Sequence, residues 1–309
     1  MRRHRGLIRF RWTCCFLVLL GAGLLLLTAS TRGGSSTSFK FSTLDVSGLT
    51  SAVGVEAFAI NSSGEIVGDD TTQGFLYQKA GRCNVLKIPW SGVFGSRAWG
   101  INDEGDIVGG FSSADGAHGY LRKGGTFTRI DVPGATDTSS RAINNRGEIV
   151  GDYIKADAHH FFLLKGGNFS TIEPPLVNPV LLPQPEALGI NDSGHIVGYL
   201  DFFNPGLCHS GFIYADGKFK TIDVPGAKET LAQGINNHDQ VVGYYTDGCT
   251  GYAAHGFLYM NGQFTRFDVP GAKATWPHGI DDAGRIVGTF DDASGSVGAW
   301  HAFIATPTP

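Results

Sequence analysis

The sequence predicts an all-β fold, a six-bladed β-propeller of four-stranded blades that is closed by its N-terminal strand joining the last blade. Three observations predict it. One phrase recurs six times at a fixed interval, each repeat contains short strand-like runs separated by turn residues, and the final repeat lacks a strand that the N-terminus can supply. A period in the forties indicates an array in which each repeat forms one supersecondary unit.

The recurring phrase is (Gly/Ala)-Ile-Asn-x-x-Gly-x-(Ile/Val)-Val-Gly, with Asp239 at the middle Gly position in one copy. Its asparagine, once an aspartate, stands at Asn61, Asn102, Asn144, Asn191, Asn236 and Asp281, at intervals of 41, 42, 47, 45 and 45 residues. The position precedes a turn, where a short amide can hydrogen-bond its own backbone. We therefore interpret it as structural.

Four short strands account for one repeat. In the copy that contains Asn236 they are 233–236, Gln240–Tyr245, His255–Tyr259 and Gln263–Val269, rich in β-branched and aromatic residues. Asn261-Gly262 suits a tight hairpin, and Pro270-Gly271 suits a type II turn. Apolar residues do not recur at helical spacing, so a helical solenoid is not expected. A β-solenoid usually has a shorter period, and a sandwich would not repeat.

The last repeat has no fourth strand of its own. It runs from Gly279 through His301-Ala302-Phe303-Ile304, and the chain stops at Pro309. Near the N-terminus, Lys40–Val46 closely matches Lys218–Val224, the fourth strand of an earlier repeat. We expect the N-terminal strand to complete the last blade, because closure of the ring removes exposed sheet edges. The propeller is placed at residues 39–306.

Residues 1–30 are typical of an export leader. Five arginines precede an apolar run from Cys14 to Thr28, and Thr28-Ala29-Ser30 offers small residues for cleavage. The alternative is an uncleaved membrane anchor, since the run is near the shorter end of a spanning helix. Residues 31–38 form a flexible linker. We expect an extracellular, periplasmic or cell-surface location, with membrane contact only through this segment if it is uncleaved.

Charge argues against a nucleic-acid partner. The chain has 24 basic and 28 acidic residues, and the leader holds five of the basic ones and none of the acidic ones. The remaining 19 basic and 28 acidic residues give a net charge of −9. Phosphate neutralisation dominates nucleic-acid affinity, so a negative protein without a basic cluster is a poor candidate. The charge is interpreted as a solubility feature.

Three cysteines lie beyond the leader. Cys208 and Cys249 fall in corresponding loops of adjacent repeats, 17 and 13 residues after Asn191 and Asn236. Export permits disulfides, so a bridge between these two is a hypothesis that the sequence leaves open. Cys83 would then be unpaired. Because no Cys-x-x-Cys pair is present, we do not expect a cysteine zinc site.

A second repeated element is a histidine triplet, found as His118-Gly119-Tyr120, His160-Phe161-Phe162, His255-Gly256-Phe257 and His301-Ala302-Phe303. With the other repeated phrases, it resembles the HAF-repeat family of predicted extracellular bacterial proteins, over roughly residues 40 to 306. That resemblance implies export and a repeat fold, and it supplies no activity or catalytic residue. The histidines could suggest a metal-binding ring. Equivalent positions in a propeller diverge radially, so we interpret them as donors that tie strands or blades together.

The variable loops between second and third strands are the candidate binding sites, because variable loops on a rigid scaffold commonly carry function. Their acidic residues are Asp115, Asp157, Asp201, Asp247, Asp291 and Asp292, and their aromatics are Phe202, Phe203, Tyr252 and Trp300. Carboxylates beside aromatics suit a sugar, and carboxylates alone suit calcium. The alternative is that these acids only solvate exposed loops.

Function remains open between three hypotheses. The first is an exported, non-catalytic binding or interaction module for carbohydrate or a cell-surface component. The second is a carbohydrate-active hydrolase or lyase that uses the variable-loop face, and the third is a purely structural surface protein. Catalytic, calcium-loop and phosphate-loop motifs are absent from the sequence, which favours the first. A cluster of buried carboxylates or histidines at the axial mouth would favour the enzyme.

Overall fold

The computed structural model describes residues 38–44, 46, 54–78, 81–175, 184–201, 208–249, 253–292 and 300–308. These ranges contain 24 strands and no helix. Accordingly, no helix that could cross a membrane occurs in the described part of the chain. The predicted leader, and the linker up to residue 37, lie outside the described residues.

Six antiparallel sheets of four strands form a ring. The first blade contains β2 (Glu56–Ile60), β3 (Ile66–Asp69), β4 (Gly74–Gln78) and β5 (Arg82–Val85). The second contains β6 (Gly95–Ile101), β7 (Ile107–Ser113), β8 (Gly116–Lys123) and β9 (Thr126–Ile130), and the third β10 (Asp137–Ile143), β11 (Ile149–Lys155), β12 (Ala158–Lys165) and β13 (Asn168–Ile172). The predicted six-bladed β-propeller is confirmed.

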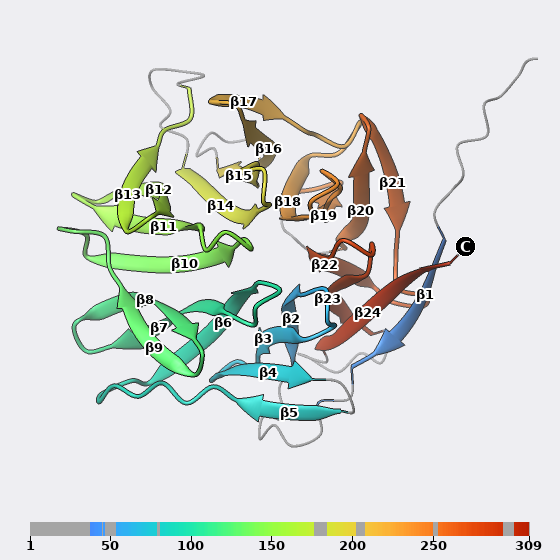
Figure 1. Ribbon diagram of the computed structural model, residues 1–309. Coiled ribbons are helices and arrows are strands. Elements are labelled where there is room, and N and C mark those ends of the chain that lie inside the picture. Colours follow the sequence, from blue (N-terminus) through green and yellow to red (C-terminus); the bar gives the residue numbers. More distant parts are fainter. Residues whose placement is uncertain are drawn as a thin grey trace, which may run out of the picture. The chain divides into compact units, whose positions relative to one another are not determined.

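The fourth blade contains β14 (Gln184–Ile190), β15 (Ile196–Asp201), β16 (Ser210–Ala215) and β17 (Lys218–Thr221). The fifth contains β18 (Glu229–Ile235), β19 (Val241–Thr246), β20 (His255–Met260) and β21 (Gln263–Phe267), and the sixth β22 (Ala274–Ile280), β23 (Ile286–Asp291), β24 (Trp300–Thr308) and β1 (Ser38–Thr43). In Figure 1 the first strand of each blade lies nearest the centre and the fourth lies outermost.

The N-terminal strand β1 pairs with β24 from the other end of the chain. Their antiparallel register runs from Ser38 opposite Thr308 to Thr43 opposite Phe303, and Figure 1 shows β1 in blue beside β24 in red. Phe41 packs against Phe303, with ring centroids 6.0 Å apart. The last blade therefore combines three C-terminal strands with one N-terminal strand.

The repeated asparagine links each blade to the next. The side-chain oxygen of Asn236 accepts a 3.0 Å hydrogen bond from the Gln240 backbone N–H, and its amide nitrogen donates to the Asp281 carbonyl of the next blade at 2.9 Å. Equivalent inter-blade bonds start at Asn61, Asn102, Asn144 and Asn191. In the sixth blade Arg285 donates to the carbonyl of Asn61, 3.2 Å away. The structural interpretation of the asparagine is supported.

The first strand of every blade contains one extra residue. The register against the second strand shifts in each blade, for example between Ala57 and Ala59. The residues at the shift are Phe58, Trp99, Arg141, Leu188, Gln233 and His278. A β-bulge of this kind leaves one residue unpaired and re-aims its side chain. All six side chains line a pocket at the ring centre.

Apolar side chains fill the space between neighbouring blades. Each hydrophobic cluster combines residues of two blades, as where Val197 of β15 packs with Phe257 of β20. The histidines of the triplets lie further out, where His118, His160 and His255 hydrogen-bond Asp131, Glu173 and Asp268 beyond the fourth strand of their own blade. These contacts support the expectation that the histidines tie strands together.

Candidate functional site

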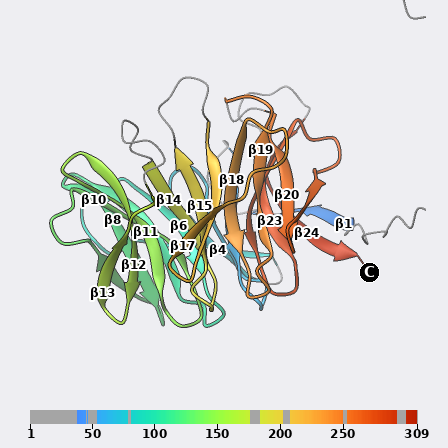
Figure 2. The ribbon, with the colours of Figure 1, turned by 90° about the horizontal axis from the view of Figure 1, so that it is seen from above.

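The candidate site is a pocket on the central axis, on the face where the first strands begin. We call this face the loop face, because it also carries the connections between blades and those between the second and third strands of each blade. Figure 2 shows the ring turned by 90° from the view of Figure 1. The pocket has a volume of about 150 Å³, and its walls are the six bulge residues together with Glu56 and Arg97. It continues into a channel of about 90 Å³ that passes the isoleucines preceding each repeated asparagine.

Two carboxylates stand opposite each other at this pocket. Glu56 of β2 is paired across the sheet with Asp69 of β3. Asp69 is almost completely buried, accepts a hydrogen bond from the Thr71 backbone N–H at 2.8 Å, and has its Oδ2 3.1 Å from Nε of Arg97. Like charges directly opposite on a sheet are unfavourable, so one group resists ionisation.

Burial and the charge of Asp69 raise the pKa of Glu56 to about 7, against a smaller opposite effect of Arg97. Burial also raises the pKa of Asp69 above its ordinary value, although the Thr71 N–H and Arg97 counteract it. Glu56 is therefore close to half-protonated at neutral pH. A carboxyl group in that state can both give and accept a proton, which is the property required of a general acid or base.

The opposite wall of the pocket holds a charged network around Arg141. Its Nε lies 2.5 Å from Oδ1 of Asp152, and its Nη2 lies 3.7 Å from Oε2 of Glu186. The guanidinium also lies over the ring of Trp99, 4.3 Å from its centroid. Burial and Glu186 raise the pKa of Tyr199, which keeps this phenol protonated. The network fixes the orientation of Trp99 and Glu186 before any ligand enters.

His278 supplies an uncharged side chain to the same pocket. Burial lowers its pKa to about 4, so it is a neutral imidazole at physiological pH. Its ring lies edge-on to Phe58 at 5.3 Å, and its Nδ1 is 3.4 Å from Oε1 of Gln233. A neutral imidazole can accept or donate one hydrogen bond to a hydroxylated ligand.

The loop residues expected from the sequence do not line this pocket. Asp115, Asp157 and Asp247 are exposed, and Asp115 is engaged by His118 and Arg129. Asp291 and Asp292 are half-buried, with Asp292 paired to His301 at 3.1 Å, and Trp300 is 42 % exposed with its ring 6.3 Å from Trp276. Asp201 ends β15, but its side chain is outside the description, as are Phe202, Phe203 and Tyr252. Binding by these loop residues stays a prediction.

Sequence reasoning missed the six bulge residues. They occupy one column of the repeat, three positions before the repeated asparagine, where all six residues differ, whereas the next position is always Gly or Ala and the one after it is always Ile. The loops are the more conspicuous variable segments, because their length changes as well as their sequence. A column with six different residues directly before a repeated (Gly/Ala)-Ile-(Asn/Asp) was the signal that could have located the axial pocket.

Calcium does not fit the axial pocket. Glu56 is the one acidic side chain among the described residues that line the pocket, the nearby Asp69, Asp152 and Glu186 are paired with Arg97 or Arg141, and no group of three or more His, Cys, Asp or Glu side chains in the described ranges is arranged to hold a metal ion. A calcium site has six to eight oxygen ligands. Calcium binding by the loop acids stays a prediction.

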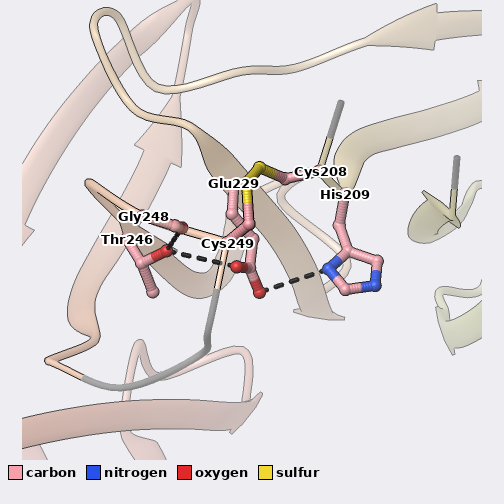
Figure 3. Close-up of a disulfide and its surroundings, with 6 residues drawn as sticks. All are labelled: Cys208, His209, Glu229, Thr246, Gly248 and Cys249. Carbon is pink, nitrogen blue, oxygen red and sulfur yellow. Dashed lines mark hydrogen bonds and ion pairs between the residues drawn. A yellow bond between two sulfur atoms is a disulfide. The ribbon is translucent and has the colours of Figure 1, made fainter. Parts of the chain in front are cut away.

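A disulfide ties the loop face together between blades four and five. The bridge between Cys208 and Cys249, with Cα atoms 5.5 Å apart, confirms the hypothesis drawn from their matching loops (Figure 3). Near it, Glu229 is hydrogen-bonded by His209 at 3.2 Å and by the Thr246 hydroxyl at 3.2 Å. Cys83 is the one free cysteine among the described residues, and it is half-buried.

Comparison with known proteins identifies the fold. No protein-family model matches the chain, and no curated protein matches it. Among solved structures, a protein of unknown function from Dyadobacter fermentans is 9 % identical with a TM-score of 0.56, and the match covers 89 % of this chain and 100 % of that one. A gluconolactonase from Xanthomonas campestris is 13 % identical (TM-score 0.52, covering 87 % and 90 %).

The calcium-binding protein regucalcin from Agrobacterium tumefaciens is 17 % identical, with a TM-score of 0.51 and coverage of 87 % of this chain and 94 % of that one. At these identities the likeness shows a shared propeller fold. Membership of the HAF-repeat family stays a prediction from the sequence.

Proposed function

We propose that the protein is an enzyme of the hydrolase or lyase class that acts on a carbohydrate-derived substrate in the axial pocket. The observation that carries the proposal is Glu56, whose pKa of about 7 is set by its burial and by the opposing Asp69. Strongly shifted carboxyl groups in a cleft are typical of catalytic sites. Buried carboxylates at the mouth of the axis are the feature that, from the sequence analysis, favours an enzyme over a binding module.

Six side chains in or beside the pocket have roles in this proposal. Glu56 transfers the proton, and Asp69 is the positioning residue that keeps its pKa near neutrality. Arg97, whose side chain is 53 % exposed, can bind a carboxylate or a developing negative charge. Trp99 offers an aromatic face, and Gln233 and His278 offer neutral hydrogen-bonding groups to hydroxyls. The gluconolactonase neighbour acts on a sugar derivative, which is consistent with this substrate class but adds only the fold.

The test compares Glu56→Gln with wild type against sugar lactones, uronides and aryl glycosides. We expect wild-type turnover with a pH profile that bends near 7, and a loss of about 10² to 10⁴-fold in the variant. Glu104→Gln is the matched control, because Glu104 is 63 % exposed on the turn between β6 and β7, at the end of β6 that lies away from the loop face. A Glu56→Gln variant as active as wild type would contradict the proposal.

Non-catalytic glycan binding is the second candidate. The observation that favours it is the aromatic pair Trp276 and Trp300 near the start of β22 and β24, with Trp300 exposed on the loop face. Stable binding of a glycan without turnover, lost in Trp300→Ala and retained in Glu56→Gln, would support this candidate instead.

Export is part of the proposal. The Cys208–Cys249 bridge supports it, because disulfides persist in oxidising compartments and are rare in the cytosol. Fractionation of producing cells, with detection of the protein outside the cytoplasm, tests this part separately from the catalytic one.

A further inference from the structure

We propose that the axial pocket is the inner end of a longer groove across blades one and two, which binds a chain of several sugar residues and passes Phe94. The inference rests on the proposed function for its inner end, and it adds the length of the substrate and the side chains that hold its outer part.

The groove follows from two cavities that continue the axial pocket outward. A cavity of about 390 Å³ shares Arg97 and Trp99 with the axial pocket and extends to Phe94. A second cavity of about 520 Å³ shares Phe94 and Ser96 with the first and extends over Trp90. Together they offer several times the roughly 150 Å³ of the axial pocket, so a ligand confined to the axis would leave most of the space unused.

Both aromatic and hydroxyl-bearing residues line the groove. Trp90 is half-buried and stacks on Phe111, which is only 4 % exposed and supports it from below, with ring centroids 4.8 Å apart. The hydroxyl-bearing side chains are Thr71, Thr72, Ser96, Ser112 and Ser139. The faces of a sugar ring present apolar C–H groups, which pack on aromatic rings, while its hydroxyls need hydrogen-bond partners. The groove provides both along its length.

Phe94 is the exposed contact at the point where the two cavities meet. Its side chain is 72 % exposed, the most exposed of the large hydrophobic residues in the described ranges. Its backbone is nevertheless fixed, because its N–H donates to the Ser112 carbonyl at 3.1 Å. An exposed aromatic ring on a fixed backbone loses little conformational freedom when a ligand packs on it.

The turn between β3 and β4 contributes Thr71 and Thr72 to the wall of the groove. Asp70 is fully buried, and its Oδ1 accepts hydrogen bonds from the backbone N–H groups of Thr72 and Gln73 and from the Thr72 hydroxyl. Thr71 has a φ of 73°, which is rare and costly for a β-branched residue. Strain that is maintained by a buried carboxylate is a feature of binding and catalytic sites.

On the inner side, Gly110 makes room for Trp99. A Cβ atom at this position would come within 2.6 Å of the indole ring. The equivalent second-strand positions in three other blades carry Asp69, Asp152 and Tyr199. Blade two therefore has no side chain at this position, which lies where the axial pocket meets the groove.

A peptide is a weaker match to this surface than a sugar chain. One common way for an extended peptide to bind is to add to a free strand edge. Here the backbone N–H groups of Phe94 and Ser96 are already bonded to the carbonyls of Ser112 and Thr72. Recognition in the groove thus depends on side-chain rings and hydroxyls.

The test measures dissociation constants for glucose- and uronate-based series of one to six residues, and for a random peptide pool. We expect affinity to rise with chain length, and Phe94→Ala to weaken binding of the longer members about tenfold while leaving monosaccharides unchanged. Met260→Ala is the matched control, because Met260 is also exposed, at 38 %, on a different blade. Because Phe94 is exposed, its removal should leave the melting temperature unchanged.

Length-independent affinity, equal binding by Phe94→Ala and wild type, or binding of peptides alone would each overturn the groove. The outcome is separable from that of the proposed function. Length-dependent binding that is sensitive to Phe94→Ala but unaccompanied by turnover leaves the groove standing and removes the catalytic role of Glu56. Suppose instead that short substrates are turned over equally by Phe94→Ala and wild type, and that added sugar residues do not increase affinity. That result would leave the catalytic role of Glu56 standing and would remove the groove.

Discussion

The repeated asparagine illustrates how one side chain serves both its own turn and the next blade. In Asn144 the side-chain oxygen accepts the Glu148 N–H at 2.9 Å, and the amide nitrogen donates to the Asn191 carbonyl at 3.0 Å. Aspartate has no such donor. Asp281 therefore needs Arg285, which lies 2.5 Å from the carboxylate and donates to the first blade in its place. The one replacement of the repeated asparagine is therefore compensated locally.

Replacement of Asn236 by alanine should destabilise the protein by about 2 to 4 kcal/mol, because it leaves the buried turn and the Asp281 carbonyl without their partners. Urea denaturation measures the loss. Asn237→Ala is the control. Asn237 is exposed on the same turn, so water can replace the partners of its side-chain hydrogen bonds. Equal losses in the two variants would show that burial of the amide is unimportant.

Glu56 should make stability depend on pH. The pKa of Glu56 is about 7 in the folded protein and 4.5 when the side chain is free of the fold, so folding favours the protonated carboxyl group. Its contribution is complete below pH 4.5 and is lost as the pH rises through 7. Relative to wild type, Glu56→Gln should gain up to about 3 kcal/mol between pH 4.5 and 8. Denaturant titrations at both pH values check this, and a constant difference would contradict it.

At the scale of the strand, the bulge explains the repeated glycine. The Gly of Ile-Val-Gly lies opposite the bulge, where the first strand approaches closely. A Cβ atom on Gly243 would come within 2.0 Å of the Leu231 carbonyl oxygen, and one on Gly68 within 1.9 Å of the Glu56 carbonyl oxygen. Only glycine fits, so the bulge and the glycine recur together. The same bulge sends the variable side chains into the axial pocket.

Gly243→Ala should therefore cost about 3 kcal/mol or more, because the clash involves backbone that cannot move without disturbing the sheet. Gly248→Ala in the same blade is the control, since nothing lies within 4 Å of the Cβ position there. Thermal unfolding of both variants tests the expectation. If both variants melt at the wild-type temperature, close approach does not explain the glycine.

For the molecule as a whole, the sequence predicted the architecture better than the site. The period, the Asn261-Gly262 and Pro270-Gly271 turns and the missing last strand are local signals, and they specified the blades, the N-terminal pairing and the Cys208–Cys249 loops. The pocket depends on six residues about 45 positions apart that meet only when the ring forms. The pKa of Glu56 depends on burial, which no repeat phrase encodes.

A chain that begins at Gly48 should lose most of its stability, because it lacks β1 and leaves the edge of β24 unpaired. It also loses Phe39 and Phe41, whose rings lie 5.0 and 6.4 Å from Phe267. A chain that begins at Thr37 is the control. Calorimetry of the two proteins provides the comparison, and identical melting temperatures would show that the sixth blade does not depend on its N-terminal strand.

The pairing of Ser38 with Thr308 also bears on how this protein can be engineered. Both described ends emerge from the circumference, on the two adjacent strands furthest from the axis in their blade. A tag or a surface tether fused at either end would therefore leave the central opening free. A short peptide joining the two ends would allow the chain to be reopened at any other inter-blade connection. In the resulting circularly permuted proteins, the contribution of each inter-blade connection to stability can be measured separately.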